Sequence, residues 1–129
     1  MTDRNRGKAP SQRQLKVGEL IRHALAEIFA RGEIVDEVLD QYSLTVSEVR
    51  MTPDLKLATV FALPLGGEGA EDAVQHLDKH KRFLRGELAR RVSLKFMPEL
   101  RFKIDTSFAS SKRIDELLAS PKVARDIDG

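Results

Sequence analysis

Apolar side chains recur every three or four positions in the first part of the chain. They are Leu15, Val17, Leu20, Ile21, Ala24, Leu25, Ile28 and Phe29. This spacing is typical of one face of an amphipathic helix, which turns by about 100° per residue. Ser11 can cap the first backbone N–H groups, and Gly32 favours a helix end, so the pattern predicts a helix over residues 12–31.

A β-strand is predicted over residues 42–51, after an acidic connection over residues 33–41 that has room for a short helical turn. Leu44 and Val46 alternate on one face of the strand, but the next apolar positions shift by one residue, to 49 and 51. Because strand side chains alternate strictly between faces, this shift indicates a β-bulge or a twist.

A second strand is predicted over residues 56–65, and it is apolar on both faces. A strand that is central in a sheet, or covered on both sides, has this composition. The sequence Thr52-Pro53-Asp54-Leu55 is typical of a turn, so the two strands should form an antiparallel hairpin. The glycine-rich sequence that follows, over residues 66–69, lacks the Lys and Ser or Thr of a phosphate-binding loop and is interpreted as a plain connection.

The segment over residues 71–96 has helical periodicity with an interruption. Its apolar positions are Ala73, Val74 and Leu77, and then Phe83, Leu84, Leu88 and Val92. A straight helix would place Lys81 inside the apolar stripe and Phe83 far outside it. We therefore predict two helices, or one kinked helix, with the bend near His80-Lys81-Arg82.

Residues 100–105 alternate strictly between apolar and polar side chains, as a half-buried strand does. A short amphipathic helix is predicted between residues 106 and 118. The order is therefore helix, strand, strand, helix–bend–helix, strand and short helix. It predicts an α+β domain with a three-stranded sheet and helices packed on one face, in the arrangement of a type II KH domain.

The composition indicates one domain over residues 11–118, preceded by a disordered basic arm over residues 1–10 and followed by a flexible tail over residues 119–129. The chain has 129 residues and no cysteine, which excludes disulfides, thiol catalysis and cysteine-ligated metals. It has no apolar run long enough to span a membrane and no secretory signal. We expect a cytoplasmic protein.

Basic residues concentrate in the second helical unit. The segment from Lys79 to Lys95 holds seven basic residues and one acidic residue, although the whole chain carries a net charge of only +2. Such segregation gives a local positive field that attracts polyanions, and in a KH-like domain it favours RNA binding. The alternative interpretation is a solvated helix face with internal ion pairs, such as Glu87 with Arg91.

The candidate RNA contacts are basic side chains that could neutralise phosphates with release of counterions. They are Lys79, Lys81, Arg82, Arg85, Arg90 and Arg91, which we expect to be displayed around the bend and along the following helix. A second basic patch on the first helix consists of Arg13, Lys16 and Arg22. Aromatic residues make up only 5% of the chain and tryptophan is absent, so recognition of RNA shape and backbone is expected over base stacking.

Two other classes of function compete with RNA binding. A protein–protein adaptor without direct RNA contact could use the acidic residues 36–40 and the strand that is apolar on both faces. An enzyme is poorly supported, because no nucleophile elbow or phosphate loop is present. His76 and His80 lie one helical turn apart, with Asp72 a turn earlier, but no fourth ligand is evident, and neither a metal nor another cofactor is predicted.

Several stretches resemble the ribosome-binding factor A family of bacterial small-subunit maturation factors. They include Val17-Gly18-Glu19-Leu20-Ile21-Arg22, Pro53-Asp54-Leu55-Lys56, Phe83-Leu84-Arg85-Gly86-Glu87-Leu88 and Met97-Pro98-Glu99-Leu100-Arg101-Phe102. The likeness spans roughly residues 12–118. The family usually has an Ala-x-Gly kink, whereas this chain has His80, Lys81 and Arg82 there.

The resemblance implies a function that charge and periodicity alone do not. It implies a monomer that binds 16S rRNA in free or immature 30S subunits and assists late maturation and processing of that RNA, without catalysis. It also implies support of growth in the cold and release from the mature subunit by a GTPase.

Overall fold

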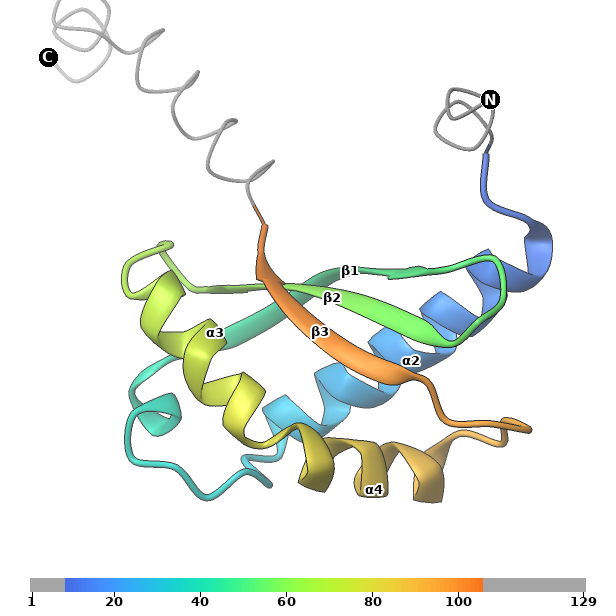
Figure 1. The fold of residues 1–129 in the computed structure, drawn as a ribbon. Coiled ribbons are helices and arrows are strands. Elements are labelled where there is room, and N and C mark those ends of the chain that lie inside the picture. The colour runs from blue at the N-terminus through green and yellow to red at the C-terminus, as the bar shows by residue number, and fades with distance from the viewer. Residues whose placement is uncertain (1–8, 106–129) are drawn as a thin grey trace, which may run out of the picture.

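Three strands form one layer and three α-helices form a second layer within residues 9–105, the part of the chain that the computed structural model describes (Figure 1). The elements are α2 (Gln12–Ala30), the 3-10 helix η1 (Leu39–Gln41), β1 (Leu44–Met51), β2 (Leu57–Pro64), α3 (Ala70–Lys79), α4 (Lys81–Arg91) and β3 (Glu99–Ile104). The predicted C-terminal helix and tail lie outside the described residues, as does most of the predicted basic arm.

The sheet has the strand order β1-β2-β3 and is mixed. Strands β1 and β2 form the predicted antiparallel hairpin, and their register shifts between Val46 and Glu48. The bulge predicted from the change of apolar phase is thereby confirmed, with Ser47 as the additional residue. Strand β3 pairs parallel to β2, from Leu57 opposite Glu99 onward.

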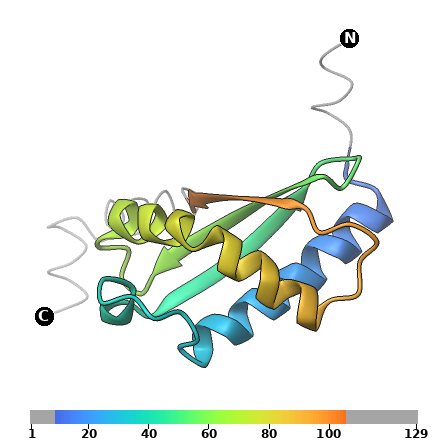
Figure 2. The same ribbon diagram turned by 60° about the horizontal axis from the view of Figure 1, so that its bottom comes forward.

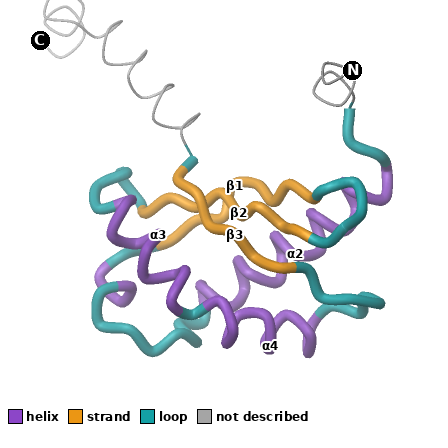
Figure 3. Tube along the Cα trace, viewed as in Figure 1, coloured by secondary structure: helices purple, strands orange, loops and turns teal. Residues whose placement is uncertain are grey.

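The helices cover one face of the sheet, as predicted (Figures 2 and 3). Helix α2 packs against β1, α3 packs against β2 and β3, and α4 packs against α2. No described helix covers the opposite face, where Phe61 is half-buried beneath the guanidinium of Arg50, 5.0 Å from the ring centroid. Strand β2 is the central strand of the sheet, which is one of the two alternatives that its composition predicted.

The core lies between the two layers. Ile21, Leu25 and Ile28 of α2 are fully buried, as are Leu77 of α3 and Leu84 and Leu88 of α4. They pack with Ala58, Val60 and Ala62 of β2. Burying one such large aliphatic side chain contributes roughly 1.5–3 kcal/mol, so this shared core holds the three helices firmly against the sheet.

Helix α2 begins where the sequence predicts. Ser11 Oγ accepts a hydrogen bond from the backbone N–H of Gln14 (3.1 Å), and Gln14 Oε1 accepts one from the N–H of Ser11 (2.9 Å). This reciprocal capping box satisfies two N–H groups that a helix start leaves unpaired. The amide of Gln14 also donates to the carbonyl of Met51 (2.9 Å), which ties the start of α2 to the end of β1.

Candidate nucleic-acid interface

Helices α3 and α4 meet at a bend at His80, whose backbone is not helical (φ −102°, ψ 14°). The predicted bend is confirmed, but not for the predicted reason. Phe83, expected on the apolar face, is 41% exposed. The buried side chains Ala73, Leu77, Leu84 and Leu88 keep the spacing of an unbroken helix. The apolar pattern of the core therefore does not explain the change of direction.

A cluster of one aspartate and two histidines fixes the bend. Asp36, in the acidic connection, lies with its Oδ2 2.8 Å from His80 Nε2 and 3.1 Å from His76 Nδ1. Because a carboxylate only accepts hydrogen bonds, both ring nitrogens donate to it. Asp36 Oδ1 accepts from the backbone N–H groups of Val38 and Leu39. The cluster joins the loop before η1 to the bend.

These contacts change the acidity of Asp36. The hydrogen bond from His80 lowers the pKa of the carboxyl well below its usual range, and those from Leu39 and His76 lower it further. The side chain of Asp36 is only 11% exposed. It therefore belongs to the internal support of the bend and contributes little to an accessible acidic surface of the kind that an adaptor would use.

Four of the predicted basic residues come together at this bend. Lys79, Lys81, Arg82 and Arg85 line one hollow of about 530 Å³, with Glu99 at the start of β3 as its acidic member. We call this the bend hollow. Its cationic residues come from the end of α3 and the first turns of α4, so the change of helix direction is what gathers them. A KH domain uses a loop at this place to clamp the nucleic-acid backbone.

The charges of the bend hollow are mostly available to a ligand. Lys79 and Arg82 are exposed and form no ion pair within the described residues. Lys81 Nζ lies 2.9 Å from Asp78 Oδ1, but its side chain is 41% exposed. Exposed pairs of this kind contribute little stability, so a phosphate can replace the aspartate as partner.

Arg85 has a structural task as well as a place in the bend hollow. Its Nε and Nη2 donate to the backbone carbonyls of Pro98 and Met97, each at 3.0 Å. Its Nη1 lies 3.3 Å from Glu99 Oε2. Arg85 thereby fixes the segment that leads into β3, and it pairs with the acidic residue of the bend hollow.

Arg91 lies apart from the bend hollow, and the prediction that it is displayed to solvent is wrong. Its side chain is 20% exposed and contacts three carboxylates, with distances of 2.5 Å to Glu33, 2.8 Å to Glu87 and 3.1 Å to Glu27. The hydrogen bond to Glu87 is the main cause of a raised Arg91 pKa. Arg90 is displayed, at 78% exposed, with Glu87 3.6 Å away. Arg91 thus joins α4 to α2 and to the loop after α2.

The patch predicted on α2 is divided. Arg13 and Lys16 are exposed near the helix start and have no ion-pair partner among the described residues. Arg22 makes a bidentate contact with Glu19, at 2.8 and 2.6 Å, and this hydrogen bonding raises the pKa of Arg22 and lowers that of Glu19. Arg13 and Lys16 therefore offer charge, whereas that of Arg22 is largely neutralised.

The sequence interpretation did not assign three side chains that lie around a second hollow. Lys56 follows the β1–β2 turn, and Lys95 and Phe96 lie in the loop between α4 and β3. The available signal was the adjacent pair Lys95-Phe96, a cation beside an aromatic ring at the end of the segment predicted to be helical.

The described part of the chain offers no other evident chemistry. Within residues 9–105, no group of three or more His, Asp or Glu side chains is arranged to hold a metal ion. No helix in the same range is both long and apolar enough to cross a membrane.

Comparison with known proteins gives consistent matches along this chain. The profile of the family described as ribosome-binding factor A matches residues 13–118. Ribosome-binding factor A of Rhodopseudomonas palustris strain HaA2 is 53% identical over 127 residues, covering 98% of this chain and 94% of the relative.

Two structural comparisons agree with that match. The crystal structure of ribosome-binding factor A from Thermus thermophilus superposes with a TM-score of 0.57 at 30% identity, covering 70% of this chain and 94% of the other. A homology model of the Thermus thermophilus protein, fitted into the cryo-EM map of its complex with the 30S subunit, gives a TM-score of 0.52 at 30% identity, covering 65% of this chain and 86% of the other.

Proposed function

Because this chain belongs to the ribosome-binding factor A family, we propose that it is an assembly factor that binds 16S rRNA in free or immature 30S subunits. There it assists late maturation and processing of the RNA without catalysing a reaction. A homology model of the related Thermus thermophilus protein has been fitted into the map of a complex of that protein with the 30S subunit, which supports the small subunit as the partner. We also propose that the protein acts as a monomer in the cytoplasm and that a GTPase releases it from the mature subunit.

The bend hollow is the observation that carries the proposal. Lys79, Lys81 and Arg82 offer three cations on one exposed surface, on a support fixed by the cluster of Asp36, His76 and His80. Neutralising phosphates requires charge in the right place and no unique hydrogen-bond geometry. A bend built from lysine and arginine can therefore bind an RNA backbone where KH domains use a glycine loop.

Sedimentation of a cell lysate through a sucrose gradient tests the proposed partner. We expect the protein to travel with free small subunits and to be scarce on fully assembled ribosomes. Recovery of the protein only at the top of the gradient, at low salt and with immature subunits present, would contradict the proposal.

A variant with Lys79→Glu, Lys81→Glu and Arg82→Glu tests the bend hollow. We expect it to lose co-sedimentation with small subunits, because three cations become three anions where the phosphates would bind. A matched control changes Arg31, Arg101 and Lys103 to glutamate. These residues are also exposed, and the control has the same net charge. Equal loss in both variants would attribute binding to overall charge and not to the bend hollow.

A further inference from the structure

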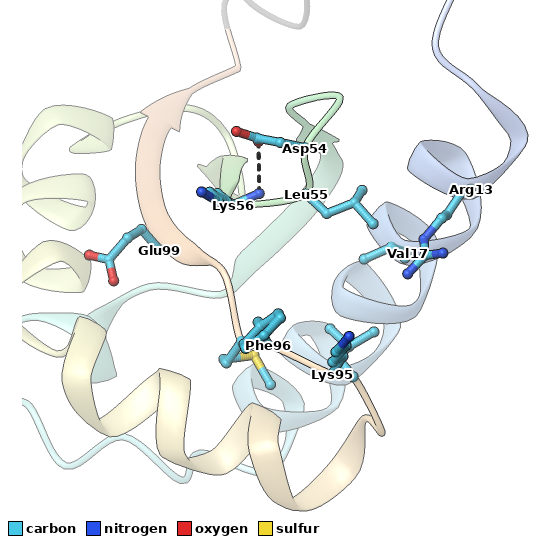
Figure 4. A pocket seen from close by; sticks show the side chains of 10 residues that line it. Arg13, Val17, Asp54, Leu55, Lys56, Lys95, Phe96 and Glu99 are labelled. Carbon is cyan, nitrogen blue, oxygen red and sulfur yellow. Dashed lines mark hydrogen bonds between the residues drawn. The ribbon is translucent and has the colours of Figure 1, made fainter.

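A second hollow lies between the start of α2, the β1–β2 turn and the loop from α4 to β3 (Figure 4). It has a volume of about 630 Å³, within the usual range for a small-ligand site. Its apolar lining comes from Val17, Leu55, Leu94, Phe96 and Met97. We call it the Phe96 hollow.

Phe96 is a large apolar side chain that is mostly exposed to solvent. It is 75% exposed, although it is one of the largest apolar side chains in the chain. Lys95 Nζ lies 5.6 Å from the centroid of its ring. An exposed ring beside a cation suits a flat π system that also carries negative charge.

The charged lining of the Phe96 hollow favours an anion. Arg13, Lys56 and Lys95 have no ion-pair partner within residues 9–105. The two acids are already engaged. Asp54 accepts hydrogen bonds from the hydroxyl of Thr52 (2.6 Å) and the backbone N–H of Lys56 (3.0 Å), as the dashed line in Figure 4 marks for Lys56, and Glu99 pairs with Arg85. The donors to Asp54 are neutral, so its carboxylate keeps its negative charge. The three cations outnumber this single unpaired acid, and the net charge of the lining is positive.

Leu55, an apolar residue of the β1–β2 turn, has an unusual backbone conformation. Leu55 is the one non-glycine residue with positive φ (62°) among residues 9–105, and its N–H donates to the carbonyl of Thr52 (2.8 Å). A branched side chain rarely adopts this conformation. Such strain is more common at sites that bind something.

The two hollows are neighbours. Glu99 lines both of them, and Arg85 fixes the backbone carbonyls of Met97 and Pro98 between Phe96 and Glu99. An RNA strand whose phosphates lie at the bend hollow can therefore extend directly toward Phe96.

We propose that the Phe96 hollow binds one unpaired nucleotide of single-stranded RNA. The base stacks on Phe96, and Arg13, Lys56 and Lys95 contact its phosphates. A nucleotide combines the flat apolar surface and the negative charge that this lining accommodates. This inference rests on the proposed function, because it assigns to the same RNA a base contact beyond the phosphate contacts of the bend hollow.

Substitution of Phe96 in the full chain tests the inference. The probes are a short fluorescein-labelled oligouridylate, which has free bases, and an RNA duplex, whose bases are all paired. Phe96→Ala should weaken oligouridylate binding by about five- to 150-fold, since stacking on one aromatic ring contributes this much. Duplex binding should not change. Phe96→Tyr keeps a stacking ring and should retain the wild-type affinity.

Phe83→Ala is the matched control, since Phe83 is an exposed aromatic residue of α4 that lines neither hollow. It should leave oligouridylate binding unchanged. Phe96 is mostly exposed, so its truncation should leave the melting temperature close to that of the wild type, and circular dichroism checks this.

Three results would overturn the inference. If Phe96→Ala binds oligouridylate like the wild type and still sediments with small subunits, the nucleotide site is wrong and the proposed function stands. If Phe96→Ala loses small subunits but keeps oligouridylate, the hollow contacts a protein. If the wild type binds neither RNA nor small subunits, the proposed function fails as well.

Discussion

At the scale of single residues, two helical glycines differ in their surroundings: Gly18 is closely packed and Gly86 is not. In α2, a Cβ atom at Gly18 would lie 2.5 Å from the backbone oxygen of Val49 in β1. In α4, a Cβ atom at Gly86 would have no atom of another element within 4 Å. The first glycine allows helix and sheet to approach closely, and the second has no packing role within the described residues.

The same substitution at the two glycines should therefore change stability in opposite directions. Gly18→Ala should destabilise the fold by about 1–3 kcal/mol, because a backbone oxygen cannot move aside cheaply. Gly86→Ala should stabilise it by about 0.5–1 kcal/mol, since alanine restricts the unfolded chain and favours a helix. Urea unfolding measures both changes. A loss of stability at Gly86 would indicate a contact made by residues outside the range 9–105.

Arg91 shows why an arginine on a helix need not contact a ligand. It separates three carboxylates, Glu27, Glu33 and Glu87, which would otherwise face one another. Arg91→Leu should therefore lower the melting temperature clearly more than Arg90→Leu, because the side chain of Arg90 is 78% exposed in the wild type. Thermal unfolding followed by circular dichroism makes the comparison. Equal melting temperatures would show that the cluster around Arg91 contributes no net stability.

At the scale of elements, the bend between α3 and α4 depends on a loop distant in sequence. Asp36 precedes η1, yet it receives hydrogen bonds from His76 and His80. The apolar periodicity predicted a bend at the right place, but it relied on Phe83, which does not pack in the core. The contact of Asp36 with two histidines about 40 residues later leaves no mark in local periodicity.

Acid should weaken this support of the bend. The pKa of Asp36 is lower in the folded protein than its ordinary value of 3.8, so its ionised form stabilises the fold above that pH. This contribution is lost progressively as the pH falls below about 4 toward the lowered pKa of the folded state, because the unfolded chain then binds the proton more readily. Asp36→Asn should lower the melting temperature at neutral pH and reduce its fall between neutral pH and pH ~3.

Thermal unfolding at a series of pH values measures this difference. The comparison with the wild type is essential, because the pKa values of Glu19, Asp54 and Glu87 are also lowered by their hydrogen bonds. These three groups contribute equally to both proteins, so the difference between the two curves reports on Asp36. Parallel curves would show that the cluster does not stabilise the fold through this charge.

At the scale of the whole molecule, charge position matters more than net charge. The chain carries only +2, but the bend hollow and the Phe96 hollow together gather Lys79, Lys81 and Arg82 with Arg13, Lys56 and Lys95. Sequence order predicted the first group, because those residues lie within four positions of one another. It did not predict the second, because the three residues come from α2, the hairpin turn and the loop before β3.

Binding of RNA through these charges should depend steeply on salt. Replacing Lys79, Lys81 and Arg82 with glutamine should reduce the slope of log affinity against log salt by about 2–3, since each lost phosphate contact removes about 0.7–0.9. Titration of a fluorescent RNA at several salt concentrations measures the slope. An unchanged slope would place the RNA-binding surface away from the bend hollow.

The pattern of apolar residues predicted all three strands, and its alternation predicted the buried face of β3. It did not predict that β3 runs parallel to β2, because alternation carries no information on strand direction. The sequence also could not predict which arginines form ion pairs, because this depends on how the helices pack against each other and against the sheet. Arg85 and Arg91 lie in the same basic segment as Arg82 and Arg90, and only the packing of α4 against α2 and β3 separates them.

The pairing of β2 with β3, the last of the described strands along the chain, has a consequence for biosynthesis. Ribosomes release the N-terminal part of a chain first, so α2 and the β1–β2 hairpin emerge while the partner of β2 is still unmade. Until residues 99–104 are synthesised, one edge of the central strand has unpaired backbone groups, an open template for aggregation. We expect the nascent chain to be most vulnerable to misassociation and proteolysis in this interval, which closes only when β3 docks.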